Sequence, residues 1–508
     1  MFKIQDFTGM QYSRDGPVIG KHDYEYFNQQ YASSSHQVDH DMNPALIVQP
    51  KEDTDTYKDM MVIDASGIPD DRALVYIGVS NRLQDFNAYL RHNDLFVPHG
   101  QCAYVCTGGH GQTGGYGQLG RSFGLFGDHI VSIRMVDNNG SIQEVTKKSD
   151  SELFYAILGG SPGNFGIITH YTIEVYRGAS YMGTVAGPNN FKGPHGLKGL
   201  WLYEPKVLSR LLGTIAKMSD DGTAPRGYDL CCSVLSTEFP ITMLFPSMQD
   251  DTIWQKVQNK IKNALSQEVL NLLNGSFPAV IVLYAQWCPT SKSDKYDASV
   301  DKWFQQFRDF QKDWKNHTLL DLPYVKRTYA TKSQTLQKDG WVDATVKRLD
   351  LIFNPQQKLG DDKSDKEGEV YDHCKLSVQI QCFGGQNSRF FANKDNGTSY
   401  SWRDSTVVQT LDCFHDPGDQ YRQYAINWQA KNDSIMIGPN SPFSKKDRRV
   451  LWGSWGDWDM SKPEIWQAYY EDAEKYKRLG KTRARADPDG TFTANPFAVA
   501  AVNDGAKL

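Results

Sequence analysis

Several features that would indicate a particular class of protein are missing from this 508-residue sequence. No apolar run approaches the roughly eighteen residues of a membrane-spanning helix, so we predict no membrane contact of that kind. Acidic residues outnumber basic ones, 60 to 55, which gives no reason to expect a nucleic-acid partner. The eight cysteines form no CxxC pair and no Cys/His metal spacing, so we predict no metal site.

The compartment is indicated only by weak signals. The stretch MFKIQDFTGM has no basic region followed by an apolar one, so no secretory signal is predicted. Most cysteines lie in apolar runs, which favours buried free thiols in a reducing compartment. Five N-x-S/T sequons favour secretion instead, although so short a pattern recurs by chance. We favour a cytoplasmic location and leave secretion open.

The first part of the chain alternates β-rich runs with glycines, which is typical of an α+β domain. The helix expected within it, at 81–93, places Leu83, Phe86 and Leu90 on one face. Strands are expected in the following segments: ALIVQP (45–50), MMVIDAS (60–66), ALVYIGVS (73–80), HIVSIRMVD (129–137) and FGIITHYTIEVY (165–176).

After about residue 196 the pattern changes to long helices and widely spaced strands. This pattern predicts a second sheet, mostly antiparallel and covered by helices on one face. Helices are expected at 252–273, 299–314 and 462–487, and strands at 277–288, 374–385 and 422–431.

The most unusual stretch is GGHGQTGGYGQLGRSFGLFGD, from Gly108 to Asp128, in which nine of twenty-one residues are glycine. Its Gly109-x-Gly111-x-x-Gly114 spacing occurs in nicotinamide-binding loops, but those loops open a helix at the last glycine. Here five further glycines follow, and each costs a helix about 1 kcal/mol. We therefore expect a glycine-rich path along another flat cofactor rather than a dinucleotide turn.

Together with VTKKSDSELFYAILGGSPGNFGIITHYTIEVY, this stretch resembles the FAD-binding domain of the vanillyl-alcohol-oxidase (PCMH) type. The similarity is to the berberine-bridge-enzyme-like subgroup, which includes hexose and oligosaccharide oxidases. VQIQCFGGQNSRF, GTSYSWRDS and the C-terminal helix segment resemble that group in the same order. The resemblance implies an FAD domain from residues 1–195, a substrate domain from 196–454 and a C-terminal return from 455–508.

The resemblance also implies the residues that would hold FAD. Cys102, in GQCAYV, matches the cysteine that forms a thioether to the flavin, so a single covalent link is expected. His110, within the cofactor loop, is expected to orient the backbone rather than act as a base. The cofactor-binding positions implied are Cys102, Gly100, Gly108, Gly109, His110, Gly114, Gly115, Tyr116, Gly117, Gly160, Asn164, Gly166 and Ile168.

The sequence departs from the family in its first subdomain. Only nine residues, Lys51 to Asp59, separate ALIVQP from MMVID, whereas a parallel crossover needs about twelve. No Gly-Gly-His loop follows, so a second covalent link is not expected. Either the chain binds FAD with a shortened first subdomain or the sequence is truncated there.

The expected catalytic base is also replaced. Gln381 stands where the oligosaccharide oxidases have Asp, and an amide cannot take up a proton. Trp455 stands where they have Tyr, and Trp402 replaces a histidine. Strand alternation places Gln379, Gln381 and Phe383 on one face, so Gln381 is expected to orient the substrate. Replacement bases implied by the sequence are Asp457, Tyr400 and His373.

Three functions follow from these residues. The first is an FAD-linked oxidase of a small natural product, with dioxygen as electron acceptor. The second is a carbohydrate oxidase. The third, of another class, is a protein that binds flavin or substrate without redox turnover.

Overall fold

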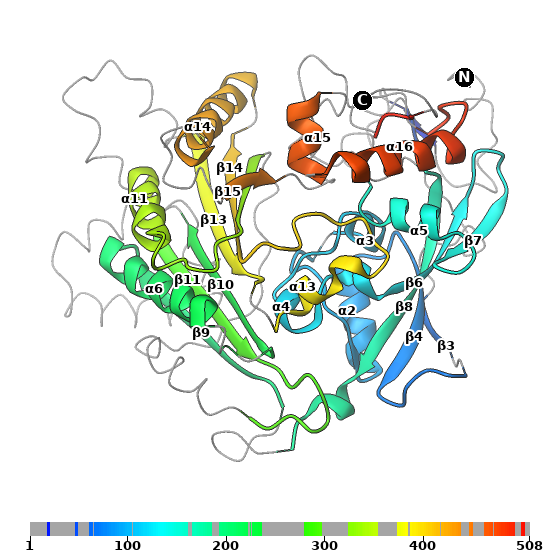
Figure 1. Ribbon diagram of the computed structural model, residues 1–508, viewed down its shortest axis with the longest axis horizontal. Helices are drawn as coiled ribbons and strands as arrows, with labels where there is room; N and C mark the ends of the chain where they lie inside the picture. Colours follow the sequence, from blue (N-terminus) through cyan, green and yellow to red (C-terminus); the bar gives the residue numbers. More distant parts are fainter. Residues whose placement is uncertain are drawn as a thin grey trace.

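The computed structural model describes residues 18–20, 46–48, 60–63, 66–103, 105–160, 165–184, 193–221, 224, 226–235, 279–296, 324–353, 373–384, 387–416, 418–437, 447–450, 462–470, 472–492 and 499–502. Two large antiparallel sheets lie side by side (Figure 1). Within the described residues, no helix has the length and apolar character needed to cross a membrane.

The first sheet has the strand order β3–β4–β8–β6–β7, with β5 paired to β8. Its strands are β3 (Met60–Ile63), β4 (Arg72–Gly78), β5 (Leu95–Phe96), β6 (Ile130–Val136), β7 (Ile142–Thr146) and β8 (Ile167–Arg177). A separate pair, β1 (Val18–Gly20) and β2 (Leu46–Val48), is also antiparallel. The short link before β3 therefore joins two different sheets, and no parallel crossover is needed there.

Helices cover one face of the first sheet (Figure 1). Leu83, Phe86 and Leu90 of α2 are buried on one face, as their spacing predicts. The C-terminal helix α16 packs on α5 and is held there by ion pairs from Arg478 to Glu152 and from Arg485 to Asp150. The helices of this half are α2 (Leu83–His92), α3 (Thr107–Gln112), α4 (Gly120–Phe123), α5 (Ser151–Ile157), α15 (Pro463–Tyr470) and α16 (Ala473–Ala486), with the 3₁₀ turns Phe126–His129 and Gly178–Tyr181.

The second sheet has the order β15–β12–β14–β13–β10–β11–β9, and every neighbouring pair is antiparallel. Its strands are β9 (His195–Leu202), β10 (Tyr228–Leu235), β11 (Val280–Trp287), β12 (Tyr324–Thr331), β13 (Cys374–Cys382), β14 (Val407–His415) and β15 (Asp447–Val450). This is the helix-covered antiparallel sheet that the sequence predicts.

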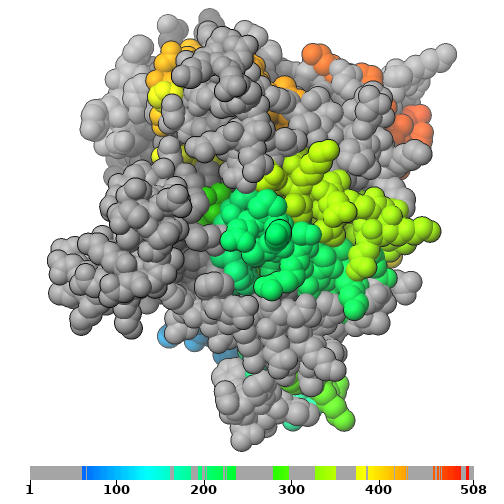
Figure 2. Space-filling model, turned by 90° about the vertical axis from the view of Figure 1, so that its left-hand side faces the viewer, coloured from blue at the N-terminus to red at the C-terminus, as the bar shows by residue number. Residues whose placement is uncertain are grey.

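The helices of the second half lie on the face turned away from the first sheet (Figure 1). They are α6 (Pro205–Asp221), α11 (Trp341–Phe353) and α14 (Asp419–Ile437), with the short α13 (Arg389–Ala392) and the 3₁₀ turn Asn393–Asp395 at the other side. Helices α6 and α11 contact each other and form the green outer surface in Figure 2. Leu376, Val378 and Ile380 of β13 are buried beneath them, whereas Phe383 packs with the core of the first half.

Two sequence predictions about helices and strands are wrong. Residues 422–431, predicted as a strand, lie within α14. Ala425, Gln429 and Asn432 are buried at helical spacing, and Gln429 Nε2 donates to the Leu411 carbonyl at 3.0 Å. Because two of these inward residues are polar, a search for apolar residues at helical spacing does not detect this helix.

The predicted final helix is two helices, α15 and α16. Asp472 breaks the run and caps α16 by accepting from the Glu474 amide at 2.9 Å. The Trp466 and Tyr476 rings stack across the break, with centroids 4.9 Å apart. The helices predicted at 252–273 and 299–314 lie outside the described residues.

Candidate functional site

The glycine-rich segment lies between the two sheets. It forms α3, a turn with positive φ at Gly114 and Gly115, and the four-residue α4. As the glycine content predicts, no long helix opens at Gly114. Gly120, the first residue of α4, faces Phe383 so closely that an added Cβ would lie 2.6 Å from that ring.

Most of these glycines are required by contacts within the protein. A Cβ at Gly108 would lie 2.9 Å from Val79, and at Gly114 it would lie 2.8 Å from Tyr116. The same holds for Gly100, Gly115 and Gly117, whose Cβ atoms would meet His110, Phe126 and the His99 carbonyl. The segment is therefore folded tightly on itself, and its approach to a flavin stays a prediction.

One position of the segment and one residue before it are exposed. Gly109 is exposed, and an added Cβ would meet no atom within 4 Å. Cys102, five residues before α3, is exposed and forms no disulfide. An open backbone and an accessible thiol at the head of the segment fit a flat cofactor that is linked through sulfur.

His110 holds the segment to the loop that carries Gly100 and Cys102. Its Nε2 accepts a hydrogen bond from the Gly100 amide at 2.8 Å, so the ring proton lies on Nδ1. Burial, with a smaller contribution from His99, lowers the pKa of His110 to about 3. The neutral ring orients the backbone, the role that the sequence predicts for it.

An aromatic cluster adjoins the glycine segment. The half-buried Tyr116 ring stacks on Trp402 with centroids 4.6 Å apart, and it meets Phe383 edge-on at 6.0 Å. Trp402 has a φ of 48°, a left-handed conformation that costs a non-glycine residue about 1–2 kcal/mol. The burial of Trp402, which is 2% exposed, and its stacking on Tyr116 offset that cost. The Trp402 ring therefore forms a fixed aromatic wall against Tyr116.

Tyr400 is unsuited to the predicted role of base. Its hydroxyl is buried and donates to the Gly111 carbonyl, and burial raises its pKa well above the ordinary value. Because the phenol keeps its proton and already has an acceptor, the structure supports a different role. Tyr400 fixes α3 against the loop that carries Trp402.

The same loop is anchored by a buried ion pair between Asp128 and Arg403. Asp128 also accepts from the Leu125 amide at 2.9 Å and from the side chains of Asn393 and Asn396 at 2.8 Å. Burial opposes its ionisation, but Arg403 and these donors outweigh burial and lower the pKa of Asp128. The end of the glycine segment is thereby tied to residues 393–403.

Gln381 lies on the face of β13 that points away from the covering helices. It is half-buried, as is Gln379, and it pairs with Cys231 of β10. Burial raises the pKa of the Cys231 thiol to about 11, and Gln381 is a hydrogen-bond partner of that thiol. Neither group takes up a proton near neutral pH, so this part of the face can orient a ligand but cannot act as a base.

His373 is separated from this face by the length of β13. It precedes Gln381 by eight positions, about 26 Å of extended chain. The His373 Nδ1 pairs with the Asp416 carboxylate at 3.1 Å. His373 and Gln381 therefore cannot serve one reacting centre, so His373 could act as a base only at a site that excludes Gln381.

The other predicted site residues either contact other parts of the first half or fall outside the described residues. Gly160 packs against Leu479 of α16, and Gly166, with a φ of 145°, packs against Met135. Ile168 is half-buried in β8. Asn164, Trp455 and Asp457 lie outside the described residues.

Sequence reasoning missed two residues of the interface between the sheets. Arg121 of α4 and Asp229 of β10 are both buried and join the glycine segment to the second sheet. The sequence did offer one signal, an arginine within a run of glycines. If such a charged side chain is buried, it needs a specific partner.

Comparison with known proteins agrees with this arrangement. Residues 54–146 match the FAD binding domain family. Berberine bridge enzyme-like 12 of Arabidopsis thaliana is 42% identical over 78 residues, which cover 15% of this chain and 14% of that protein. The matched stretches span 14 and 40% of the lengths of the first two curated relatives.

Solved structures extend the likeness to the whole fold. Berberine-bridge-enzyme-like 1 of Physcomitrella patens has a TM-score of 0.62 at 13% identity, covering 96% of this chain and 97% of that one. A chitooligosaccharide oxidase has a TM-score of 0.57 at 15% identity, covering 87% and 81%. At such identities the likeness establishes the fold. The chain thus carries a PCMH-type FAD-binding domain, and its homologues and structural neighbours are berberine-bridge-enzyme-like proteins and oligosaccharide oxidases.

Proposed function

We propose that this protein is an FAD-dependent oxidoreductase acting on a small natural product. Bound FAD would accept a hydride at N5 from a substrate carbon. The substrate loses two electrons and two protons, and dioxygen takes them up to give hydrogen peroxide. The proposal rests on an FAD-binding domain whose glycine segment faces a second, helix-covered sheet.

The carrying observation is the placement of Cys102. Its thiol is exposed in the loop that precedes the glycine segment, and His110 of α3 accepts a hydrogen bond from Gly100 of the same loop. From there the segment reaches Tyr116, whose ring meets Phe383 beside Gln381. We infer that Cys102 holds FAD through one sulfur–carbon bond, with Gly109 leaving room for it.

The residues of the second sheet favour a substrate that needs orientation more than activation. Gln381 offers an amide donor and acceptor, and its partner Cys231 stays protonated. The aromatic wall of Tyr116 and Trp402 favours a flat, partly apolar molecule through stacking. We expect slow or no flavin reduction by simple sugars because Gln381 cannot take up their hydroxyl proton.

Carbohydrate oxidation is the second candidate. The fold is shared with a chitooligosaccharide oxidase and a xylooligosaccharide oxidase, and sugars also stack on aromatic rings. A third candidate, binding without redox turnover, follows from the short link before β3 and from the absence of an assigned base among the described residues.

Acid precipitation of the purified protein tests the proposal. A covalently bound flavin leaves yellow colour in the pellet, and Cys102→Ser should release that colour to the supernatant. A colourless native protein would instead support the flavin-free function. Anaerobic bleaching with aldohexoses, cello- and chito-oligosaccharides and aromatic alcohols then separates the two oxidase functions, since fast bleaching by glucose or cellobiose contradicts the natural-product assignment.

A further inference from the structure

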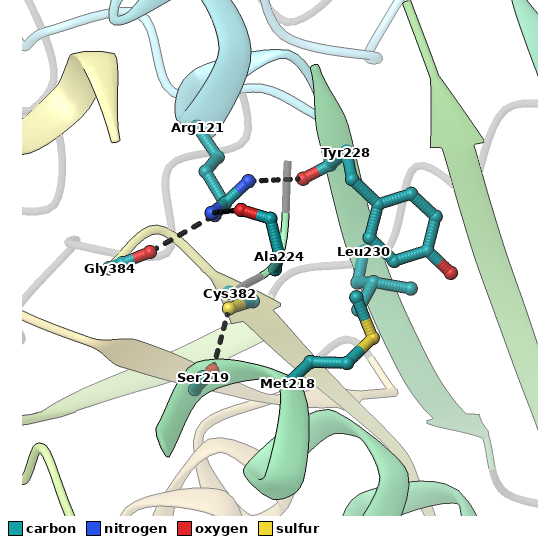
Figure 3. A pocket seen from close by; sticks show the side chains of 8 residues that line it. All are labelled: Arg121, Met218, Ser219, Ala224, Tyr228, Leu230, Cys382 and Gly384. Atoms are coloured by element: carbon teal, nitrogen blue, oxygen red, sulfur yellow. Dashed lines mark hydrogen bonds between the residues drawn. The ribbon is translucent and has the colours of Figure 1, made fainter. Parts of the chain in front are cut away.

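Arg121 forms a cluster of hydrogen bonds where the glycine segment meets the second sheet. It is 4% exposed, and its guanidinium donates to four main-chain carbonyls, three of which are drawn in Figure 3. These bonds run to Ala224 at 2.8 Å, Tyr228 and Gly384 at 3.1 Å and Arg226 at 3.3 Å. A planar fork of five donors suits such a set, whereas a lysine ammonium has three donors at a single point.

The acceptors lie at the ends of two paired strands or, for Ala224 and Arg226, in the turn just before one of them. Tyr228 begins β10, and Gly384 lies just after the end of β13. Cys231 pairs with Gln381 a few residues further along the same two strands. Arg121 therefore bridges the ends of the two strands that present the Gln381 face.

A second set of bonds holds the backbone of α4 to the same place. The Asp229 carboxylate accepts from the Arg121 amide at 2.9 Å, from the Ser122 amide at 3.3 Å and from the Ser122 hydroxyl. In return, Arg226 donates to the Ser122 carbonyl at 3.0 Å. Both the side chain and the main chain of α4 are fixed, so this helix cannot shift without breaking contacts on both strands.

These hydrogen bonds of Arg121, Ser122, Arg226 and Asp229, here called the clamp, set the spacing across the candidate site. Gly120, next to Arg121, faces the Phe383 ring, and Phe383 meets the Tyr116 ring at 6.0 Å. Tyr116 lies in the segment assigned to the flavin, and Phe383 lies two residues from Gln381. A displacement of about 1 Å between reacting groups can lower a rate about 100-fold.

We propose that Arg121 is a positioning residue that fixes the flavin segment relative to the Gln381 strand. This inference rests on the proposed function for its consequence in catalysis, but the clamp itself is a property of the chain. Its contacts are to main-chain carbonyls, so it acts on the placement of two strands rather than on any one side chain.

Amide hydrogen exchange on the full-length protein, as purified, tests the clamp without any substrate. Arg121→Ala should accelerate exchange at least about tenfold in residues 118–123, 227–232 and 380–384. Arg121→Lys should protect these residues only partly. Arg478→Ala, which removes an exposed arginine that pairs with Glu152, is the matched control and should leave the three segments unchanged.

Guanidinium rescue and flavin optical activity complete the experiment. Millimolar guanidinium chloride should restore protection to Arg121→Ala, and ammonium chloride at the same concentration should not. The visible circular dichroism of bound flavin should change in Arg121→Ala and recover with guanidinium. Unchanged exchange in Arg121→Ala, or equal rescue by both salts, would overturn the proposal. A wild-type protein without flavin would refute the proposed function alone, because the exchange result still decides the clamp.

Discussion

The buried pair of Asp128 and Arg403 gives the sharpest stability prediction. The Asp128→Asn change keeps the size of the side chain but removes its charge. Arg403, 5% exposed, would then be buried without its counter-ion. Removing one partner of a buried ion pair costs about 3–5 kcal/mol, so we expect a loss of that size in the free energy of unfolding.

Its pH dependence has a defined direction. The pKa of Asp128 is lower in the folded protein than its ordinary value because Arg403 and its other donors outweigh burial. The folded state therefore releases the proton more readily than the unfolded chain. This stabilisation is present above about pH 4 and is lost as the pH falls through the lowered pKa. The variant should lack this part of the acid transition.

Urea unfolding followed by tryptophan fluorescence measures the effect. Glu152→Gln is the matched control, because Glu152 pairs with Arg478 at the surface and should cost no more than about 1 kcal/mol. Arg403→Met in the Asp128→Asn background should recover part of the loss. A loss below about 1 kcal/mol for Asp128→Asn, or one equal to that of Glu152→Gln, would show that the pair is not an anchor.

Four further predictions concern individual side chains and two of the glycines. Gln381→Asp should add a titrating group to the pH profile of flavin reduction, and an unchanged profile would show that this side chain does not reach the reacting centre. Tyr400→Phe should lower the free energy of unfolding by about 1–2 kcal/mol through its lost bond to Gly111 but leave that pH profile intact, and loss of one limb of the profile would restore Tyr400 as a base. Gly109→Ala in α3 should leave the free energy of unfolding unchanged or raise it by up to about 1 kcal/mol. Gly117→Ala should lower the free energy of unfolding because the His99 carbonyl occupies the space that the Cβ needs. Equal melting temperatures of the two variants would contradict this prediction. Burial raises the pKa of Asp229 to about 7, so the folded state keeps a proton that the unfolded chain loses. This contribution to the free energy of unfolding is present below about pH 4 and is lost as the pH rises to about 7. Asp229→Asn should remove that pH dependence in a series of melting curves.

Local patterns in the sequence determined most of the secondary structure. Short β-rich runs marked β4, β6, β8 and β13, and helical spacing marked α2, because each element buries one face in an apolar core. The same reasoning failed for α14, where Gln429 and Asn432 face inward and donate to the carbonyls of Leu411 and Trp428. It also failed at Asp472, where a capping carboxylate competes with helix continuation.

At the candidate site, too, the sequence predicted some features of the glycine segment and not others. The sequence predicted a segment that faces flavin, a link through Cys102 and the lack of an acid at Gln381. It could not show that most of these glycines are required by contacts with neighbours such as Val79 and Phe126, because such contacts join residues distant in the chain.

Only the tertiary structure decided what joins the two halves. Arg121 donates to carbonyls more than 100 residues away, and Asp128 is neutralised by Arg403, 275 residues further along the chain. Backbone carbonyls carry no residue identity, and a buried charge can be matched by any opposite charge that the fold brings close. No local pattern therefore encodes either partner, and the interface between the sheets is determined by the folded chain as a whole.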